Sequence, residues 1–178
     1  FDESVSSAWA MGGALSYKSG WLLDRVMVGT TFYWSERLYG PEDKDGTLLL
    51  KPEQHGYSVL GQLYGRVKLF EDHIINLYRY EYNTPFIGKN DVRMTPNTFE
   101  GYTLQGSFGD KDGEPGFRYG GGYITKIKER NSDDFVWMSK DAGADVKRGV
   151  GVVGGTFTYG KFSLGAINYY SQDIINIF

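Results

Sequence analysis

Residues 84–98 read Thr-Pro-Phe-Ile-Gly-Lys-Asn-Asp-Val-Arg-Met-Thr-Pro-Asn-Thr and separate two segments that alternate as β-strands do. The stretch is not itself a strand, because its two prolines each remove a ladder donor and its Gly, Asn and Asp residues favour turns. It is longer than a hairpin turn requires, and it carries Lys89, Asp91 and Arg93 close together. We therefore expect a charged loop that folds inward over the rest of the protein.

The composition fits a single β-rich domain. The chain has 178 residues, with 25 Gly, 14 Tyr and 11 Phe against only 5 Pro. It has no Cys, which excludes disulfides, thiol catalysis and Cys-ligated metals, and its net charge of -3 argues against a nucleic-acid partner. No apolar run reaches the roughly 18 residues that a membrane-crossing helix needs, but membrane-crossing strands would leave only an alternating signal.

The alternation predicts about eight antiparallel strands in a meander. The long loops, one of them 84–98, alternate along the chain with short turns. Such a layout, with turns at one rim and loops at the other, is typical of an outer-membrane barrel. We expect the loop 129–148 to hold a short helix and residues 173–178 to begin a further loop. The predicted strands are 8–18, 22–36, 56–69, 74–83, 99–108, 117–128, 150–159 and 162–170.

The two faces of these strands differ in polarity. Apolar and aromatic residues collect on one face and basic residues on the other, which indicates lipid outside and water inside. In 56–69 the predicted outer residues are Tyr57, Val59, Leu63, Val67 and Leu69, and the predicted inner ones are Ser58, Gln62, Tyr64, Arg66 and Lys68. In 117–128 the predicted inner residues are Arg118, Lys126 and Lys128. The Trp and Tyr residues near strand ends, including Tyr33 and Tyr57, are expected to form an interfacial belt.

The sequence contains no constellation typical of an enzyme, a metal site or a cofactor site. His55 and His73 lie apart, with no third ligand at a metal spacing, and both are expected at the surface. The acidic tetrapeptides 43–46 and 110–113 lack the spaced Glu of an EF-hand, so turn chemistry explains them better.

Several segments of the sequence resemble the OprD family of bacterial outer-membrane porins, in the same order and over nearly the whole chain. They include 43–49, 56–62, Asn168-Tyr169-Tyr170, Gly122-Tyr123-Ile124-Thr125-Lys126-Ile127-Lys128 and, above all, Arg93-Met94-Thr95-Pro96-Asn97-Thr98-Phe99-Glu100-Gly101-Tyr102. The resemblance implies an all-β, antiparallel up-and-down transmembrane β-barrel, with residues 1–178 forming a single segment of about eight strands of roughly 18. Both ends, Phe-Asp-Glu-Ser and Ile-Ile-Asn-Ile-Phe, are accordingly expected to be cuts through a longer polypeptide.

The resemblance also implies a function. Family members are channels for small, mostly anionic or zwitterionic solutes such as carboxylates and amino acids. They lie in the bacterial outer membrane among lipid and lipopolysaccharide, and the full-length protein would be a monomer or a trimer. The family's third long loop folds into the lumen as a constriction, and 84–98 matches it with Arg93 at its basic position. Arg79 falls where relatives often carry Arg.

These considerations give a set of candidate residues for the solute path and its constriction. A guanidinium pairs bidentately with a carboxylate and stays charged at any working pH. Each basic residue could instead solvate the lumen wall or pair with an acid such as Glu81. The candidates are Arg93, Arg79, Lys89, Asp91, Arg66, Arg118 and Lys126.

Two other classes of protein compete with this interpretation. A soluble, lipocalin-like barrel would bind a small apolar ligand, but it would need apolar residues on the face that carries Arg66, Arg118 and Lys126. A surface adhesin or a non-conducting barrel would keep the fold and lack a pore.

Overall fold

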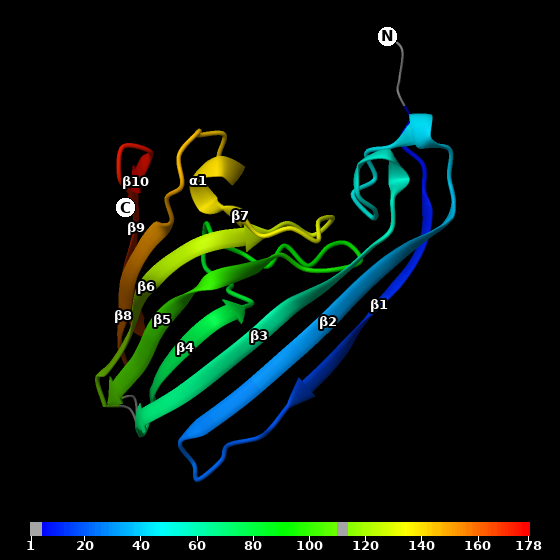
Figure 1. Cartoon of the computed structure of the whole chain (residues 1–178). Helices are drawn as coiled ribbons and strands as arrows, with labels where there is room; N and C mark the ends of the chain where they lie inside the picture. Colours follow the sequence, from blue (N-terminus) through cyan, green and yellow to red (C-terminus); the bar gives the residue numbers. More distant parts are fainter. Residues whose placement is uncertain (1–4, 110–113) are drawn as a thin grey trace.

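The computed structural model, which describes residues 5–109 and 114–178, is one antiparallel sheet (Figure 1). The sheet has ten strands in these residues, and eight of them are long. Each long strand pairs with the next along the chain, which confirms the predicted meander. The long strands are β1 (Trp9–Lys18), β2 (Val26–Tyr39), β3 (Tyr57–Phe70), β4 (His73–Tyr80), β5 (Thr98–Gly109), β6 (Gly116–Lys128), β8 (Val150–Tyr159) and β9 (Phe162–Ser171).

The remaining elements are short. The first long loop holds the 3-10 turns η1 (Glu42–Lys44) and η2 (Pro52–Gln54), and the third holds strand β7 (Val136–Trp137) and the predicted helix, α1 (Met138–Asp141). None of the helices within the described residues is long and apolar enough to cross a membrane.

Several boundaries differ from the prediction, and β2 runs to Tyr39 where an end at residue 36 was expected. The strand expected from residue 22 begins at Val26, because Leu23 and Asp24 take positive φ angles and form part of the turn. The strand expected to reach residue 83 ends at Tyr80. Residues 173–178 do not begin a loop, because Asp173 takes φ 58° in a tight turn and β10 (Ile175–Ile177) folds back to pair with β9. The tetrapeptide 110–113 lies outside the described residues.

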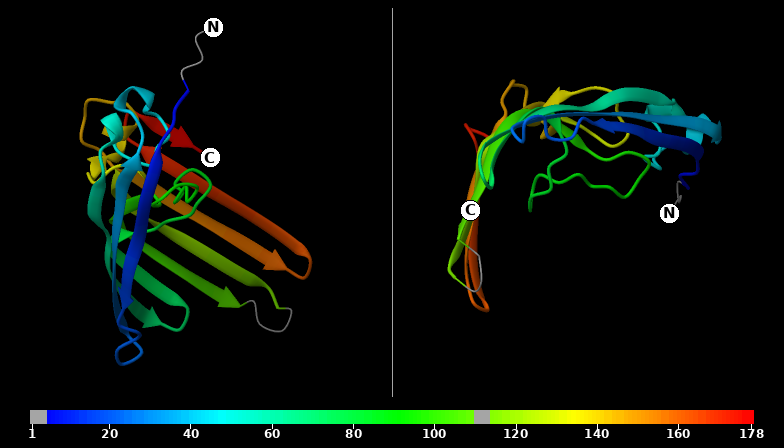
Figure 2. Two further views of the ribbon diagram at one scale, coloured as in Figure 1. Left: turned by 90° about the vertical axis from the view of Figure 1, so that its right-hand side faces the viewer. Right: turned by 90° about the horizontal axis from the view of Figure 1, so that it is seen from below.

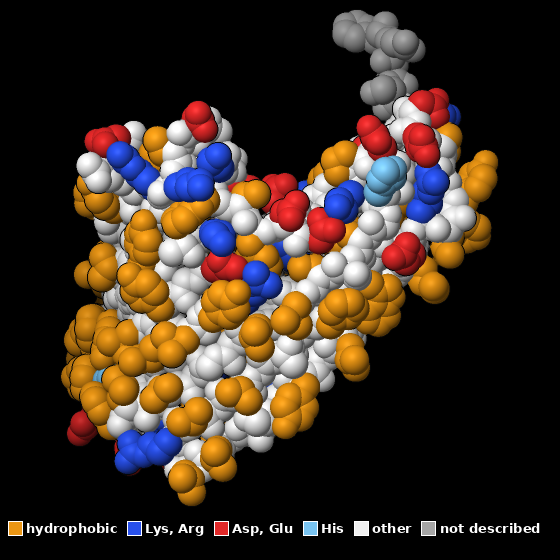
Figure 3. Space-filling model, viewed as in Figure 1, with side chains coloured by type: hydrophobic (Ala, Val, Ile, Leu, Met, Phe, Trp, Pro, Cys, Tyr) orange, Lys and Arg blue, Asp and Glu red, His pale blue; other side chains and the backbone are white. Residues whose placement is uncertain are grey.

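The sheet is strongly curved, and the 84–98 loop lies on its concave side (Figure 2). Figure 3 looks onto the convex side, where apolar side chains cover the strands and charged ones gather toward the end with the long loops. Phe32, Leu63 and Val153 are among the exposed apolar side chains of the strands. The apolar-outside pattern of a membrane barrel is therefore present.

Two β-bulges change the side to which residues point. In β3, Thr31 pairs with Gln62 but Phe32 pairs with Leu60, so Gly61 is the extra residue. Tyr57 and Val59 consequently lie on the concave side, buried, and not on the face of Leu63 as predicted. The second bulge lies in β6, where Gly101 pairs with Ile124 but Glu100 pairs with Lys126. It moves Lys126 to the opposite face from Arg118.

The buried apolar residues lie mainly beneath the loops. One cluster contains Ile87 of the 84–98 loop with Phe99, Ile124, Ile127 and Tyr169. The other contains Tyr33, Tyr57 and Val59, packed by Phe135, so the two tyrosines are not part of an exposed belt as predicted. His73 is also not at the surface, because the rings of Phe70, Phe108 and Tyr119 surround it.

Candidate functional site

The 84–98 loop lies on the concave face (Figure 2) and contacts β9 near one edge of the sheet and β1 at the other edge. At β9, the Tyr169 hydroxyl donates a hydrogen bond to Thr84 Oγ1 at 2.8 Å and accepts one from the Phe86 amide at 3.4 Å. At β1, the Met94 side chain approaches Gly12 so closely that a Cβ on this glycine would lie 2.6 Å from Met94 Cγ. The loop therefore bridges strands that are far apart in the sheet.

Hydrogen bonds within the loop hold its shape. The Thr84 amide donates to the Ile87 carbonyl at 2.8 Å, and the Asn97 amide donates to the Lys89 carbonyl at 2.6 Å. Ile87 anchors the middle of the loop in the apolar cluster. The loop is thus a compact element with its own contacts, as functional loops of this length usually are.

The third long loop, residues 129–149, supports the far end of the 84–98 loop. The Arg130 carbonyl accepts hydrogen bonds from the Tyr57 hydroxyl at 2.6 Å and from Thr95 Oγ1 at 2.7 Å. Lys128 is fully buried, and its ammonium donates to Thr95 Oγ1 at 3.3 Å and to the Glu129 carbonyl at 2.9 Å. The two contacts of the Arg130 carbonyl could not be predicted from the sequence, because they join residues 35 and 73 positions apart.

The charged residues of the loop divide into a paired group and an exposed one. Lys89 Nζ lies 3.2 Å from Glu81 Oε1 and 3.5 Å from Asp91 Oδ2. The hydrogen bond to Glu81, and then the charges of both carboxylates, raise the pKa of Lys89. Arg93 is exposed, and its guanidinium donates to the Val92 carbonyl at 3.4 Å. Asp91 therefore pairs with Lys89, and the Arg93 side chain faces solvent.

Arg66 and Arg118 also lie on the concave side. Arg66 Nε donates to Asn76 Oδ1 at 2.9 Å, and the Arg66 guanidinium lies 5.7 Å from the Trp21 ring centroid and 5.9 Å from that of Tyr80. Arg118 lines a groove between the 84–98 loop and strands β5, β6, β8 and β9.

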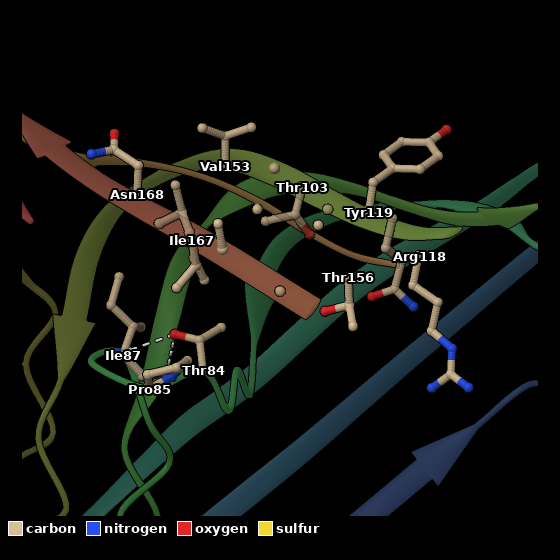
Figure 4. A pocket seen from close by; sticks show the side chains of 18 of the residues that line it. Thr84, Pro85, Ile87, Thr103, Arg118, Tyr119, Val153, Thr156, Ile167 and Asn168 are labelled. Atoms are coloured by element: carbon tan, nitrogen blue, oxygen red, sulfur yellow. Dashed lines mark hydrogen bonds between the residues drawn. The ribbon is translucent and has the colours of Figure 1, made fainter. Parts of the chain in front are cut away.

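This groove has a volume of about 870 Å³ and includes no Asp or Glu among its lining residues in the described part of the chain. In Figure 4 the guanidinium of Arg118 points away from Thr84 and Ile87, and Thr156 lies between. Apolar and hydroxyl side chains form most of the wall, and Arg118 lies at one end of the groove.

Arg79 and Lys126 lie elsewhere. Arg79 pairs in register with Leu63 and with Glu100, and Lys126 pairs with Glu100, so all three side chains start from the face opposite to the 84–98 loop. The β6 bulge turns Lys126 to this face, and the positive φ of Tyr78 interrupts the alternation just before Arg79. The structure thus places Arg93, Lys89, Asp91, Arg66 and Arg118 on the concave side and joins Arg79 to Lys126 through Glu100.

Sequence reasoning missed the residues that tether the loop. Thr84 begins the 84–98 loop and Tyr169 lies within a family-like segment, but neither carries a charge, and only the fold reveals that they meet. Within residues 5–109 and 114–178, no three His, Asp or Glu side chains gather as the ligands of a metal ion would.

One family model matches nearly the whole chain, and several solved structures share its fold. A family model described as outer membrane porin, OprD family, matches residues 2–178. A search of the curated proteins found no match. Among solved structures, OccK9 (OpdG) from Pseudomonas aeruginosa is similar with a TM-score of 0.77 at 23% identity, over 95% of this chain and 44% of that chain.

Two further structures show the same fold. A BenF-like porin from Pseudomonas fluorescens Pf-5 has a TM-score of 0.79 at 18% identity, over 96% of this chain and 44% of that one. OpdK from Pseudomonas aeruginosa has a TM-score of 0.74 at 19% identity, over 97% of this chain and 45% of that one. The chain described here therefore spans less than half the length of each of these structures.

Proposed function

Because this chain belongs to the OprD family of outer membrane porins, we propose that it forms part of a pore for small anionic or zwitterionic solutes, such as carboxylates and amino acids. The observation that carries the proposal is the 84–98 loop, which crosses the concave face and is held by hydrogen bonds to β9 and to β3. In a closed barrel such a loop would narrow the lumen. Residues 1–178 would then be one wall segment of that barrel together with its constriction.

The proposed mechanism is electrostatic. A carboxylate that enters a narrow lumen loses part of its hydration, and nearby cations lower the free energy of that step. Arg93, Arg66 and Arg118 lie on the concave side, and an arginine stays protonated at any working pH. Lys89 and Asp91 balance one another within the loop, and Glu81 beside it adds one negative charge, which the exposed guanidinium of Arg93 offsets. No covalent step or cofactor enters this mechanism.

Two observations support the proposed class of solute and the proposed contact with the membrane. One of the similar structures is OpdK with vanillate, a carboxylate, at a TM-score of 0.74 and 17% identity. The convex face carries exposed apolar side chains, as a face in contact with lipid and lipopolysaccharide would. A soluble, lipocalin-like barrel is disfavoured because its apolar residues would line the inside.

The test is the substitution Arg93→Ala in the full-length protein, recorded in planar bilayers under a salt gradient. We expect the reversal potential to shift toward lower anion selectivity, because the loop loses its exposed positive charge. Arg37→Ala is the matched control, since it removes the same charge near the C-terminal end of β2. There Arg37 Nη1 lies 3.5 Å from Glu42 Oε1. Unchanged selectivity and conductance would remove Arg93 from the mechanism, and an absence of any pore would favour a non-conducting barrel.

A further inference from the structure

Strand β4 ends before its neighbours β3 and β5 do, toward the end of the sheet that carries the long loops (Figure 1). It has 8 residues, where β3 has 14 and β5 has 12. The last pair between β3 and β4 is Leu63 with Arg79, whereas β3 continues to Tyr57. Above this pair the wall therefore lacks a strand, at the point where the chain leaves for the 84–98 loop.

Arg79 connects β3 and β5 through its guanidinium. Its Nη1 donates to the Leu60 carbonyl of β3 at 3.1 Å, beyond the last pair of the ladder. Its Nε and Nη2 donate to Glu100 Oε1 of β5 at 3.0 and 2.9 Å. Lys126 of β6 completes the set, because its Nζ lies 2.9 Å from Glu100 Oε2. Three side chains thus connect four strands, and we call Arg79, Glu100 and Lys126 the ion clasp.

The carboxylate at the centre of the ion clasp is shielded from water, and the two cations, with Lys126 31% exposed, are partly shielded. The side chain of Glu100 is 9% exposed and that of Arg79 is 22% exposed. The ring of Phe135 lies with its centroid 4.0 Å from Arg79 Cζ, and Trp137 lies 6.0 Å from Lys126 Nζ. Removal of one partner would leave a poorly hydrated charge behind, so a single substitution should disturb the whole set.

The backbone beside the ion clasp is strained. Tyr78 takes φ 77°, which is unfavourable for an aromatic residue and persists only where the surroundings impose it. Tyr78 precedes Arg79 directly, and β4 ends one residue later at Tyr80. The strain and the ion clasp therefore coincide at the root of the 84–98 loop.

We propose that the ion clasp positions this loop, by fixing where β4 ends and at what angle the chain leaves the wall. The inference rests on the proposed function, in which the loop sets the width of the pore. Arg79 and Lys126 then act as positioning residues and contact no solute, although both are basic.

The test measures the loop and the pore separately. In the full-length protein in lipid vesicles, spin labels are attached to Asn90→Cys at the loop and Lys18→Cys at the opposite rim, in a background without other cysteines. Glu100→Gln and Arg79→Met should each broaden the distance distribution between the labels. In planar bilayers the same two variants should show several-fold more frequent conductance substates.

Charge distinguishes an ion clasp from a solute path. Arg79→Met removes a positive charge and Glu100→Gln a negative one, so residues that line the path would shift the ion selectivity in opposite directions. The ion clasp predicts the same loosening for both variants, with little change in selectivity. It also predicts that the double variant is no looser than Arg79→Met alone, because both substitutions break one connected set.

The outcomes separate the two proposals. Lys68→Met is the control, because it breaks the Lys68–Asp24 pair at 2.6 Å near the short turns and should leave the loop unchanged. Distances as narrow as in the wild type for both Glu100→Gln and Arg79→Met would overturn the ion clasp. Broadened distances with wild-type conductance would retain the ion clasp and overturn the role of the loop in the pore. If these variants do not fold, Lys126→Met, which leaves the Arg79–Glu100 pair intact, should show a smaller broadening, and its absence overturns the ion clasp.

Discussion

An ion pair between Lys51 and Asp133 joins the first and third long loops. Lys51 Nζ lies 2.8 Å from Asp133 Oδ1 and donates to Oδ2 at 2.9 Å. This hydrogen bond holds the pKa of Asp133 below its usual range, with partial burial acting in the opposite direction. Because Asp133 lies in the loop that also carries Arg130, the ion pair indirectly supports Thr95 of the 84–98 loop.

The lowered pKa of Asp133 makes this contact sensitive to acid. Its native pKa lies below the unfolded value of about 3.9, so the stabilisation is complete above that pH and is lost as the pH falls through the native pKa. The pair is about one-third exposed, so we expect it to contribute roughly 0.5–1 kcal/mol. Thermal unfolding measured between pH 6 and pH 2 should show that the wild type loses this contribution to its stability, whereas Lys51→Met, which lacks the ion pair, does not.

Lys44→Met, in the same long loop, is the control for this prediction and should keep the wild-type pH dependence. Parallel curves for the wild type and Lys51→Met would show that the ion pair does not couple the two loops.

At the scale of the elements, alternation was sufficient to predict all eight long strands and the 84–98 loop. Periodicity reports which residues share a face as long as the ladder is regular, and β2 and β5 are regular over most of their length. It fails after a bulge, because one unpaired residue reverses the direction of every later side chain. Gly61 and the bulge beside Thr125 therefore misplaced Tyr57, Val59 and Lys126 in the prediction.

The tethers of the 84–98 loop were out of reach for a different reason. A hydrogen bond such as that between Tyr169 and Thr84 joins residues 85 positions apart, and neither residue departs from the local pattern of its own segment. The charged candidates of the loop could be found because charge density is a local property of the sequence. The contacts that position them depend on the curvature of the sheet.

The tether at β9 gives a prediction for the loop as an element. Tyr169→Phe removes the bond to Thr84 Oγ1 and the acceptor of the Phe86 amide, at a cost of about 1 kcal/mol in local stability. The loop should open more often, so trypsin should cleave after Lys89 and Arg93 faster than in the wild type. Limited proteolysis of the full-length protein in vesicles measures this rate.

Tyr170→Phe is the matched control, because Tyr170 is the adjacent residue and is half exposed. Equal cleavage rates for the wild type and Tyr169→Phe would mean that the loop is held by its other contacts alone.

For the molecule as a whole, the opposite polarity of the two faces is the feature that a membrane requires. Val153 lies mid-strand in β8 on the apolar face and is 62% exposed, whereas Thr156 of the same strand pairs with Arg118 on the other face. Val153→Arg should destabilise the full-length protein in bilayers by roughly 2–4 kcal/mol, because its charge would lie in hydrocarbon. Thr156→Arg should cost much less. Equilibrium unfolding from vesicles by urea compares them, and equal costs would contradict the assignment of the faces.

The distance in sequence between Thr84 and Tyr169 also constrains the order in which the molecule assembles. Strands β4 and β5 can pair as soon as both are made, since their contacts are local, but the loop between them lacks its contacts at Thr84 and Phe86 until β9 has joined the sheet. Contacts between residues so far apart form late, because the chain must first close a large loop. We therefore expect an assembly intermediate in which β4 and β5 are paired but the 84–98 loop is not yet held at Thr84. The loop would take its final position across the concave face only after β9 has joined the sheet.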